Sequence, residues 1–486
     1  MDRLMGLVGV LFFLGLAVLL SRDRKAIHGR TVAWALLLQW VFAVVVLKGE
    51  VIGRGLQAMV PWPGFWVGQA GPEGTYLGLG WIVVAAMFLP MVLQRFVGFR
   101  SRSLNWCLFA SIAGAMLWGN LVGKSFDRMR RVVEHLMSYA HEGASFVFGP
   151  LADTAPKGMG AAVLNDSFQT IGHVGMVFAF VVLPTIIFVA SIFAVLYYLG
   201  VMQWIVGATA RAMGRLLKVS GAESVSVAAS ILMGQTEAPL TIRPFLARFT
   251  RSELMTIMTA GMAHVSGSIM VAYVQIARVD IVHLLTAVIM TAPGAIMMAK
   301  ILEPETETPE TAGEVKVDIP RTDANLLDAA ARGASEGGHL AFNVAIMLVA
   351  FIALVALVNG LMKALHPAFT LEAVLATVFK PFAFLMGVPW SEAGMVGALL
   401  GKRMVINEFV AFIQLGEIAQ ISDKAKLVST FALCGFANFS SIAIQVGGIG
   451  ALVPERRGDL AKLGFKAMLA GTLANFLSAC IAGVLG

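Results

Sequence analysis

The sequence predicts an all-α polytopic membrane protein that contains an inverted repeat with two re-entrant helical hairpins and discontinuous helices. Two features of composition lead to the membrane assignment. Only 13% of the 486 residues are charged and 58% are hydrophobic, whereas about 25% of the residues of a soluble domain are charged. The mean hydropathy is +0.81. A third feature, one interrupted apolar pattern that recurs in both halves of the chain, leads to the repeat.

The positive charge is distributed as topology signals. The formal net charge is +7, but the basic residues lie in short loops between apolar runs, as they do at the cytoplasmic ends of membrane spans. The cysteines Cys107, Cys434 and Cys480 are scattered without a CxxC pair, which argues against a disulfide framework or a zinc site. We therefore predict no cofactor and no nucleic-acid partner.

Apolar runs near the length of about 20 residues that a helical span requires recur along the chain. The ten predicted spans are residues 4–20, 31–47, 79–94, 103–122, 172–200, 254–277, 282–299, 341–362, 427–451 and 464–485. The first resembles the apolar core of a signal peptide, but it lacks a cleavage site and basic residues follow it, so we predict a retained span. The stretches 224–242 and 393–415 are broken by Gly, Pro or acidic residues, and we predict re-entrant hairpins there.

The basic loops predict the sidedness. With both termini outside, hairpin 224–242 enters from the cytoplasmic face, hairpin 393–415 enters from the outer face, and the basic loops are cytoplasmic. The basic residues Lys124–Arg131 would then lie outside, in an amphipathic interfacial helix at about 125–142.

Six segments make up the predicted organisation. They are two membrane helices (1–55), an inserted pair of membrane helices (56–124), an interfacial helix with a scaffold membrane helix (125–203), a first repeat of hairpin, broken helix and membrane helix (204–300), a cytoplasmic linker with an interfacial helix (301–335), and a second repeat of scaffold helix, hairpin, broken helix and last membrane helix (336–486). The inserted pair adds an even number of spans and so preserves the sidedness downstream.

The two hairpins resemble each other and are followed by similar interruptions. Residues 234–240 read GQTEAPL and residues 406–410 read INEFV, so each hairpin places a carboxylate after a polar residue. The spans that follow are interrupted by small and polar residues at 261–268 and 435–441. Inverted repeats with broken helices are an architecture of secondary transporters. Because non-helical backbone at that depth lines a cavity or is buried in protein, we predict a substrate site where the breaks meet.

Glu237 and Glu408 are the predicted charged members of this site. An ionised side chain at the centre of a bilayer costs roughly 2.5–3.5 kcal/mol on insertion scales unless it is paired or hydrated. Their recurrence in the repeat favours a role as acceptors for substrate N–H or O–H groups. The alternative is a buried ion pair with Arg243 or Arg403.

Uncharged side chains of the same segments suit a polar, uncharged substrate with hydroxyl and amide edges. They are Gln235, Thr236, Asn438 and Ser441. Hydrogen bonds between helices are the alternative role for such residues. Phe436 can stack on a flat ring, and packing is its alternative.

Phosphate-loop and zinc-protease motifs are absent from the sequence. The stretches 119–125 and 397–402 have one residue too few between their glycines for a phosphate-binding loop, and no HExxH occurs. Since the chain offers neither a nucleophile nor a metal site, we predict that it is not an enzyme.

Five stretches carry a family resemblance. They are GQTEAPL at 234–240, residues 252–273, AFNV at 341–344, NEFVAF at 407–412 and CGFANFSSIAI at 434–444. Together they resemble the concentrative nucleoside transporter family, over about 1–55 and 125–486. The resemblance implies a homotrimer in the bacterial inner membrane that imports nucleosides such as uridine together with an ion. It also implies a scaffold and a transport domain that slides like an elevator.

The resemblance further implies residue roles. The implied substrate-binding residues are Gln235, Thr236, Glu237, Ile269, Glu408, Phe436, Asn438 and Ser441. Those of the first hairpin, with Ile269, would lie near the nucleobase, Phe436 would pack on it, and the others of the second repeat would hold the ribose.

Two positions depart from sodium-coupled members of the family. Ser230 stands where they have Asn, and His264 stands where they have a small hydroxyl residue. Sodium prefers oxygen ligands, so a sodium site at Ser230, Met233, His264 and Val265 would depend on the carbonyls of Met233 and Val265. We favour coupling to H⁺ over Na⁺, with His264 or Glu237 as the carrier, because histidine titrates near neutral pH. A structural role for His264 is the alternative.

Other functions are weighed against this one. A sodium-coupled nucleoside symporter and a transporter of another polar metabolite, such as a nucleobase, are the nearest alternatives. A channel would need a continuous polar pore, whereas the polar residues of this sequence cluster in one place.

Overall fold

The computed structural model describes residues 2–49, 51–52, 54, 67–70, 74–77, 121–152, 162–164, 170–173, 177–311, 323–367 and 369–486. The chain divides into two compact units, one of Met1–Phe42 with Val132–Gly486 and one of Ala43–Arg131. All of the residues predicted for the site lie in the first unit.

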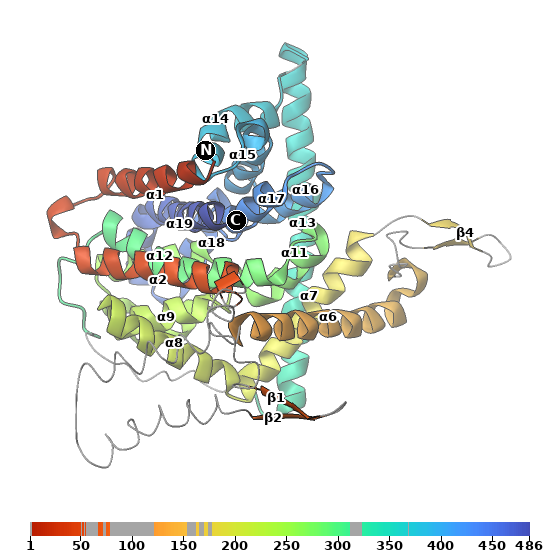
Figure 1. Cartoon of the computed structure of the whole chain (residues 1–486), viewed down its shortest axis with the longest axis horizontal. Coiled ribbons are helices and arrows are strands. Elements are labelled where there is room, and N and C mark those ends of the chain that lie inside the picture. Colours follow the sequence, from red (N-terminus) through yellow and green to blue (C-terminus); the bar gives the residue numbers. More distant parts are fainter. Residues whose placement is uncertain are drawn as a thin grey trace. The chain divides into compact units, whose positions relative to one another are not determined.

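Helices make up nearly all of the described chain (Figure 1). In chain order they are α1 (Asp2–Leu19), α2 (Gly29–Leu47), α6 (Leu121–Phe148), α7 (Phe178–Tyr198), α8 (Val201–Leu217), α9 (Gly221–Ser230), α10 (Arg251–Ala263), α11 (Gly267–Ala277), α12 (Ile281–Leu302), α13 (Leu326–Leu365), α14 (Leu371–Leu385), α15 (Trp390–Val405), α16 (Glu408–Glu417), α17 (Asp423–Leu433), α18 (Phe439–Leu452) and α19 (Arg457–Leu485). The 3-10 helices are η1 (Arg24–Ala26), η2 (Gly149–Ala152), η3 (Ala238–Arg248) and η4 (Pro454–Arg456).

Two short antiparallel strand pairs add to the predicted helical content. They are β1 (Val67–Ala70) with β2 (Gly74–Leu77), and β3 (Ala162–Leu164) with β4 (Thr170–His173). These strands were not predicted, because a three- or four-residue strand is too short to show a hydrophobic period.

Six of the described helical segments are long and apolar enough to cross a membrane, or seven if the bent pair of α14 and α15 counts as one. Six of the predicted spans coincide with them. The predicted span 4–20 is the shorter apolar helix α1, and 427–451 is divided between α17 and α18. The predicted spans 79–94 and 103–122 lie outside the described residues, apart from the first residues of α6.

The first predicted hairpin consists of α9, a turn, and η3, which has a proline in its first turn. The broken span that follows consists of α10 and α11, separated by extended backbone at His264. Capping boxes at Ser220–Glu223 and Thr250–Glu253 begin α9 and α10. A capping box satisfies two of the free backbone N–H groups at a helix start, so the polar residues here begin helices.

The second repeat follows the same plan. The hairpin consists of α15 and α16, and the broken span consists of α17 and α18. Asparagine caps the second helix of each pair: Asn407 accepts from Val410 N at 2.9 Å, and Asn438 accepts from Ser441 N at 2.9 Å. The predicted architecture of two hairpins and two broken helices is confirmed.

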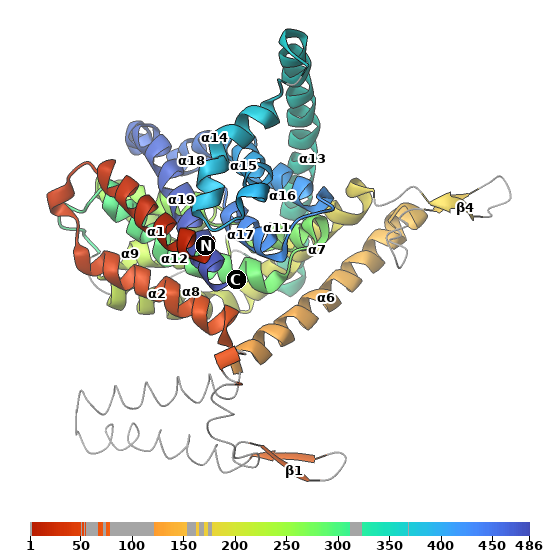
Figure 2. The same ribbon diagram turned by 45° about the horizontal axis from the view of Figure 1, so that its top comes forward.

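The helix α19 forms the centre of the core, and it packs against α1, α10, α12, α17 and α18 (Figure 2). The Asn475 side chain of α19 bridges the two helix breaks, because its Nδ2 donates to the carbonyl oxygens of Ala263 and Cys434, each at 2.9 Å. The breaks also touch directly, since Phe436 N donates to His264 O at 3.3 Å. Packing thus joins two interruptions that lie far apart in the sequence.

The boundary predicted near residue 335 does not coincide with a helix end. The helix α13 runs unbroken from Leu326 to Leu365, so the predicted interfacial helix and scaffold helix are one element. It lies along α7 (Figure 1). A Cβ on Gly333 would lie 2.5 Å from Ala194 Cβ, and one on Gly337 would lie 2.7 Å from Ala190 Cβ. These glycines therefore permit close packing of α13 against α7.

The helix α14 is an element that the sequence analysis missed. It packs against α15 and meets it at an angle of 118°. Pro381 lies inside α14. The short turn that follows α14 ends the apolar stretch before it reaches the length of a span.

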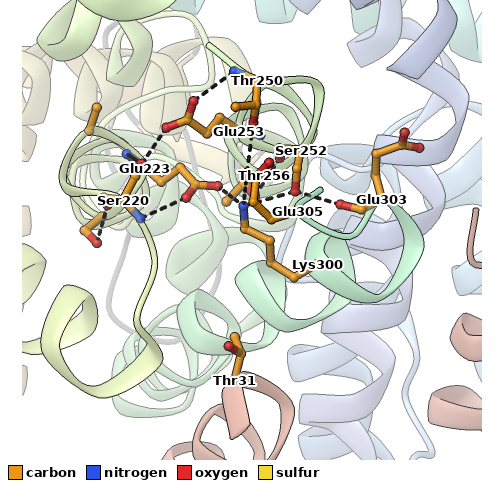
Figure 3. Close-up of polar contacts among 12 residues, drawn as sticks. Thr31, Ser220, Glu223, Thr250, Ser252, Glu253, Thr256, Lys300, Glu303 and Glu305 are labelled. Carbon is orange, nitrogen blue, oxygen red and sulfur yellow. Dashed lines mark hydrogen bonds and ion pairs between the residues drawn. The ribbon is translucent and has the colours of Figure 1, made fainter. Parts of the chain in front are cut away.

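A buried ion network joins the starts of α9 and α10 to the end of α12 (Figure 3). Lys300 Nζ lies 2.6 Å from Glu223 Oε1, 3.2 Å from Glu305 Oε2 and 3.0 Å from Ser252 Oγ. Glu253 accepts from Ser220 Oγ at 2.7 Å. The network anchors both ends of the first hairpin to one helix.

Candidate functional site

Glu408 is the centre of a buried polar cluster built from three elements. It begins α16 and is 4% exposed. Tyr273 of α11 donates its hydroxyl to Glu408 Oε1 at 2.8 Å, and Asn438 Nδ2 donates to Glu408 Oε2 at 3.3 Å. The Tyr273 ring stacks on Phe412 with ring centroids 4.2 Å apart. Neutral donors thus hold both carboxylate oxygens, which leaves their further lone pairs as acceptors.

Gln235 and Ser441 meet in a second cluster, although they belong to different repeats. Gln235 Nε2 lies 3.4 Å from Ser441 Oγ, and Gln445 Nε2 donates to Gln235 Oε1 at 3.3 Å and to Met258 O at 3.1 Å. A Cβ on Gly261 would lie 2.6 Å from Gln445 Nε2. Only glycine leaves room for the amide there, so this glycine of the first break has a steric role.

Glu237 and Thr236 lie at the turn of the first hairpin. Glu237 is exposed and its Oε2 accepts from Gly234 N at 3.2 Å. It lines a cavity of about 450 Å³. Thr236 packs its methyl group toward α18, where a Cβ on Gly448 would lie 2.7 Å from Thr236 Cγ2. The two neighbours in sequence therefore face different surroundings.

Ser230 and His264 form a buried pair. Ser230 Oγ lies 2.8 Å from His264 Nδ1 and donates to Val227 O at 2.8 Å. Since the hydroxyl has one proton, His264 donates from Nδ1, and its Nε2 is then an acceptor without a hydrogen-bond partner among the described residues. Val265 is buried, and Met233 lines the cavity beside Glu237.

Phe436 and Ile269 complete the predicted set. Phe436 is half-buried at the second break, and Ile269 of α11 is 5% exposed. Both lie on segments that carry the polar clusters, and their predicted contacts with a nucleobase stay predictions.

Arg403 is a buried cation whose hydrogen bonds go to the second break. It donates from Nη1 to Ala432 O at 2.8 Å, from Nε to Gly435 O at 3.2 Å, and from Nη2 to the Asn475 side chain. Its position at the carboxyl end of α17 complements the negative end of the helix dipole. Arg403 therefore does not form the hydrogen-bonded ion pair with Glu408 that was the alternative prediction.

Three residues of the site were missed by sequence reasoning: Tyr273, Gln445 and Asn475. Each is a polar side chain in a largely apolar helix, and one signal was available. A buried Tyr hydroxyl or side-chain amide in an apolar segment needs a hydrogen-bond partner. The sequence does not say which distant residue supplies it.

Comparison with known proteins gives three matching family models. They are "Na+ dependent nucleoside transporter N-terminus" over residues 8–60, "Nucleoside recognition" over 179–279, and "Na+ dependent nucleoside transporter C-terminus" over 283–483. These matches are consecutive along the chain and include both hairpins.

Individual proteins match over most of their length. The chain is 46% identical to the uncharacterized transporter YutK of Bacillus subtilis over 359 residues, covering 72% of this chain and 84% of that one. It is 37% identical to the nucleoside permease NupC of Helicobacter pylori over 402 residues, covering 80% and 92%. Among solved structures, CNTnw in an inward-facing substrate-bound state matches with a TM-score of 0.75 at 37% identity, covering 99% of this chain and 98% of that one.

Proposed function

The chain belongs to the concentrative nucleoside transporter family, and from this premise we propose that it is a multi-pass symporter that imports nucleosides across the bacterial inner membrane. One observation carries the proposal. The buried Glu408 carboxylate is held by Tyr273 and Asn438 where two hairpins and two broken helices converge. A carboxylate flanked by an amide suits the vicinal hydroxyls of a ribose, because it accepts hydrogen bonds from both.

The Gln235 cluster supports a place where the nucleobase binds. Its amide and the Ser441 hydroxyl offer neutral donors and acceptors to a base edge, and Phe436 offers a ring for stacking. An uncharged substrate also fits the setting, because a phosphate would bring negative charge near Glu237 and Glu408.

The fold supports an elevator mechanism. Both hairpins, both broken helices and α19 form one connected core, and they are the proposed transport domain. The paired helices α7 and α13 belong to the proposed scaffold. The exposed apolar side chains of α13, among them Phe342, Val349 and Leu361, suit lipid or the neighbouring subunits of a homotrimer. Alternating access by movement of one bundle against another is a known solution for inverted repeats.

Proton coupling is supported by the Ser230–His264 pair. The Ser230 hydroxyl is already used by Val227 O and His264 Nδ1, so a hard cation that prefers oxygen ligands would have to displace one of them. The unpartnered His264 Nε2 can accept a proton without rearranging that pair. Two of the three family models carry the description "Na+ dependent", which makes sodium coupling the second candidate.

Uptake into sealed vesicles under separate gradients tests function and coupling together. We expect purified protein to concentrate radiolabelled uridine when only a proton gradient is imposed. Uptake with a sodium gradient alone would keep the function and overturn the proton assignment. If folded protein moves neither uridine nor adenosine under either gradient, the nucleoside assignment fails; a nucleobase tested in parallel examines the remaining alternative.

Substitution of His264 tests the carrier. The variant His264→Gln keeps a neutral polar side chain but cannot be protonated, so we expect loss of proton-driven accumulation while nucleoside exchange at equal concentrations persists. His339→Gln, at an exposed position of α13, is the matched control. Undiminished proton-driven uptake in His264→Gln would assign the carrier elsewhere, with Glu237 the next candidate.

A further inference from the structure

A cavity of about 370 Å³ lies among α6, α7 and α11, and none of its lining residues belongs to the predicted substrate or ion sets. The lining includes Met137 and His141 of α6, Val181 and Thr185 of α7, and Gln275 of α11. All of them lie in the first compact unit. The volume is within the range of about 300–1,000 Å³ that is usual for small-molecule sites. The cavity is therefore a candidate ligand site apart from the one already described.

One hydrogen bond in the lining joins a helix of the proposed scaffold to a helix of the proposed transport domain. Gln275 Nε2 of α11 donates to Thr185 Oγ1 of α7 at 3.1 Å, and Thr185 Oγ1 donates to Val181 O at 3.1 Å. Close by in sequence, Phe178 of α7 meets Phe409 of α16 edge to face, with ring centroids 5.6 Å apart. A ligand in the cavity would thus contact both the scaffold and the transport domain.

The polar side chains that α6 contributes have spare hydrogen-bonding capacity. Ser138 Oγ uses its proton in a bond to His135 O at 2.7 Å, so its lone pairs stay available as acceptors. His141 Nε2 lies 3.4 Å from Ser145 Oγ, which leaves Nδ1 as a donor or an acceptor according to the tautomer. A hydroxyl group both donates and accepts, so a ligand with hydroxyl groups suits both side chains.

The rest of the lining favours an uncharged ligand with an apolar part. Met137, Ala144 and Val181 contribute apolar side chains, and no Asp, Glu, Lys or Arg is among the described residues that line the cavity. A formal charge would have no partner there, and burying an unpaired charge is costly. A neutral, hydroxylated head group joined to an alkyl chain matches both the polar and the apolar side chains.

The exposed face of α6 indicates the source of such a ligand. Val132, Tyr139 and Phe146 are exposed and recur every seven residues, so they share one face of the helix. An exposed apolar face on a helix that the sequence predicts to be interfacial suits contact with lipid. Because the same helix lines the cavity, a membrane lipid is the occupant that these observations favour.

We propose that the cavity is a regulatory site for a neutral membrane lipid with a hydroxylated head group, of the monoacylglycerol type, whose binding holds α11 against α7. This role rests on the proposed function, because it requires α11 to move with the transport domain. That movement would carry Gln275 away from Thr185 and part the walls of the cavity. A ligand that binds only one arrangement shifts the equilibrium toward it, so the bound lipid slows transport without occupying the substrate site.

Inhibition of uridine uptake by 1-monolauroylglycerol tests the site, with the full-length protein in phosphatidylcholine vesicles. Ala144→Leu fills part of the cavity from a buried position, so we expect the concentration for half-inhibition to rise about 10-fold or more. Gly143→Leu is the matched control on the same helix, because a Cβ there has no atom within 4 Å, and it should be inhibited like the unmodified protein. Methyl laurate, which has the same chain without a hydroxyl group, should not inhibit.

The Tm of the protein in phosphatidylcholine nanodiscs measures binding independently of transport. A ligand that binds the folded state raises the Tm, so 1-monolauroylglycerol should raise it for the unmodified protein and Gly143→Leu but not for Ala144→Leu. Ser138→Ala removes an acceptor at an exposed position of α6 and should weaken the effect of the lipid about 5-fold. This second variant keeps the test decisive should Ala144→Leu fail to fold.

The outcomes separate the site from the transport function. Equal inhibition of the unmodified protein, Ala144→Leu and Ser138→Ala, or equal inhibition by methyl laurate, would reveal a general effect on the bilayer and overturn the site. A raised Tm without inhibition would overturn the regulatory role. If the folded, unmodified protein transports no nucleoside, the proposed function fails, whereas the Tm series still decides whether the lipid binds in the cavity.

Discussion

Glu408 accepts its two hydrogen bonds from the neutral side chains of Tyr273 and Asn438 rather than from a charged partner. Tyr273 is fully buried, and its ring is fixed by stacking on Phe412. Its hydroxyl therefore reaches Glu408 from a rigid position. A neutral donor stabilises the carboxylate without neutralising it, so the carboxylate remains available to substrate hydroxyls.

At this scale, Tyr273→Phe keeps the stacked ring and deletes one donor. A hydrogen bond to a charged group contributes about 1.5–3 kcal/mol. We expect the KM for uridine to rise about 10-fold or more, with the amount of folded protein unchanged, in vesicle uptake assays. Tyr139→Phe is the control. An unaltered KM would mean that Tyr273 does not orient Glu408 for binding.

Two adjacent glycines of α18 show how closely elements approach at the site. A Cβ on Gly448 would lie 2.7 Å from Thr236 Cγ2, whereas a Cβ on Gly447 would have no atom within 4 Å. Gly448 therefore lets α18 contact the turn of the first hairpin, whereas Gly447 does not lie at such a contact.

The pair gives a matched experiment at the scale of elements. Both Gly→Ala changes should raise helix propensity by about 1 kcal/mol, so propensity cancels in the comparison. We expect Gly448→Ala to reduce uridine uptake severalfold and Gly447→Ala to leave it near the original rate. Equal uptake by the two variants would show that the hairpin turn shifts freely and that the contact has no functional role.

The Lys300 network gives the second prediction at the scale of elements. Lys300 is 7% exposed and pairs with Glu223 and Glu305, so Lys300→Met leaves buried carboxylates without their cation. Breaking a buried pair in this way costs about 3–5 kcal/mol. We expect a large drop in the Tm of the detergent-purified protein. Arg248→Met removes an ion pair with Glu310 in which both side chains are exposed, and it should cost about 0–1 kcal/mol.

At the scale of the whole molecule, Glu303 joins segments that are distant in the chain. Arg22 after α1 and Arg251 of α10 each lie 2.7 Å from its Oε1, and Lys466 of α19 lies 3.3 Å from its Oε2. Burial by itself would raise the pKa of Glu303, but the hydrogen bond from Arg22 and the charges of Lys466 and Arg251 outweigh it and hold the pKa below its usual value.

This lowered pKa predicts an acid-sensitive contribution to stability. A carboxyl group whose pKa is lower in the folded state stabilises the protein above its unfolded pKa of about 4.3, and that stability is lost as pH falls through the folded value. We expect Glu303→Gln to lower the Tm at pH 7, and the difference from the unmodified protein to shrink as the pH falls below about 4.3. A difference that stays constant over this range would show that the charge of Glu303 contributes nothing.

The sequence by itself determined the local features of this protein. Hydrophobic runs specify spans, and Gly, Pro and polar interruptions specify where helices break, because both depend on neighbouring residues. The repeat then pointed to Glu237 and Glu408, and the motifs around them to the family. The boundary predicted near residue 335 could not be checked by such local reasoning, because the close contact of Gly333 and Gly337 with α7 depends on tertiary packing.

The tertiary structure alone decided which polar groups meet. Glu408 joins Tyr273, Gln235 joins Gln445, and Asn475 bridges both breaks. A buried polar side chain must find a partner, but the partner is chosen by the packing of helices far apart in the chain. For the same reason the cavity that Glu237 of the first hairpin and Tyr197 of α7 both line exists only once those helices have been brought together.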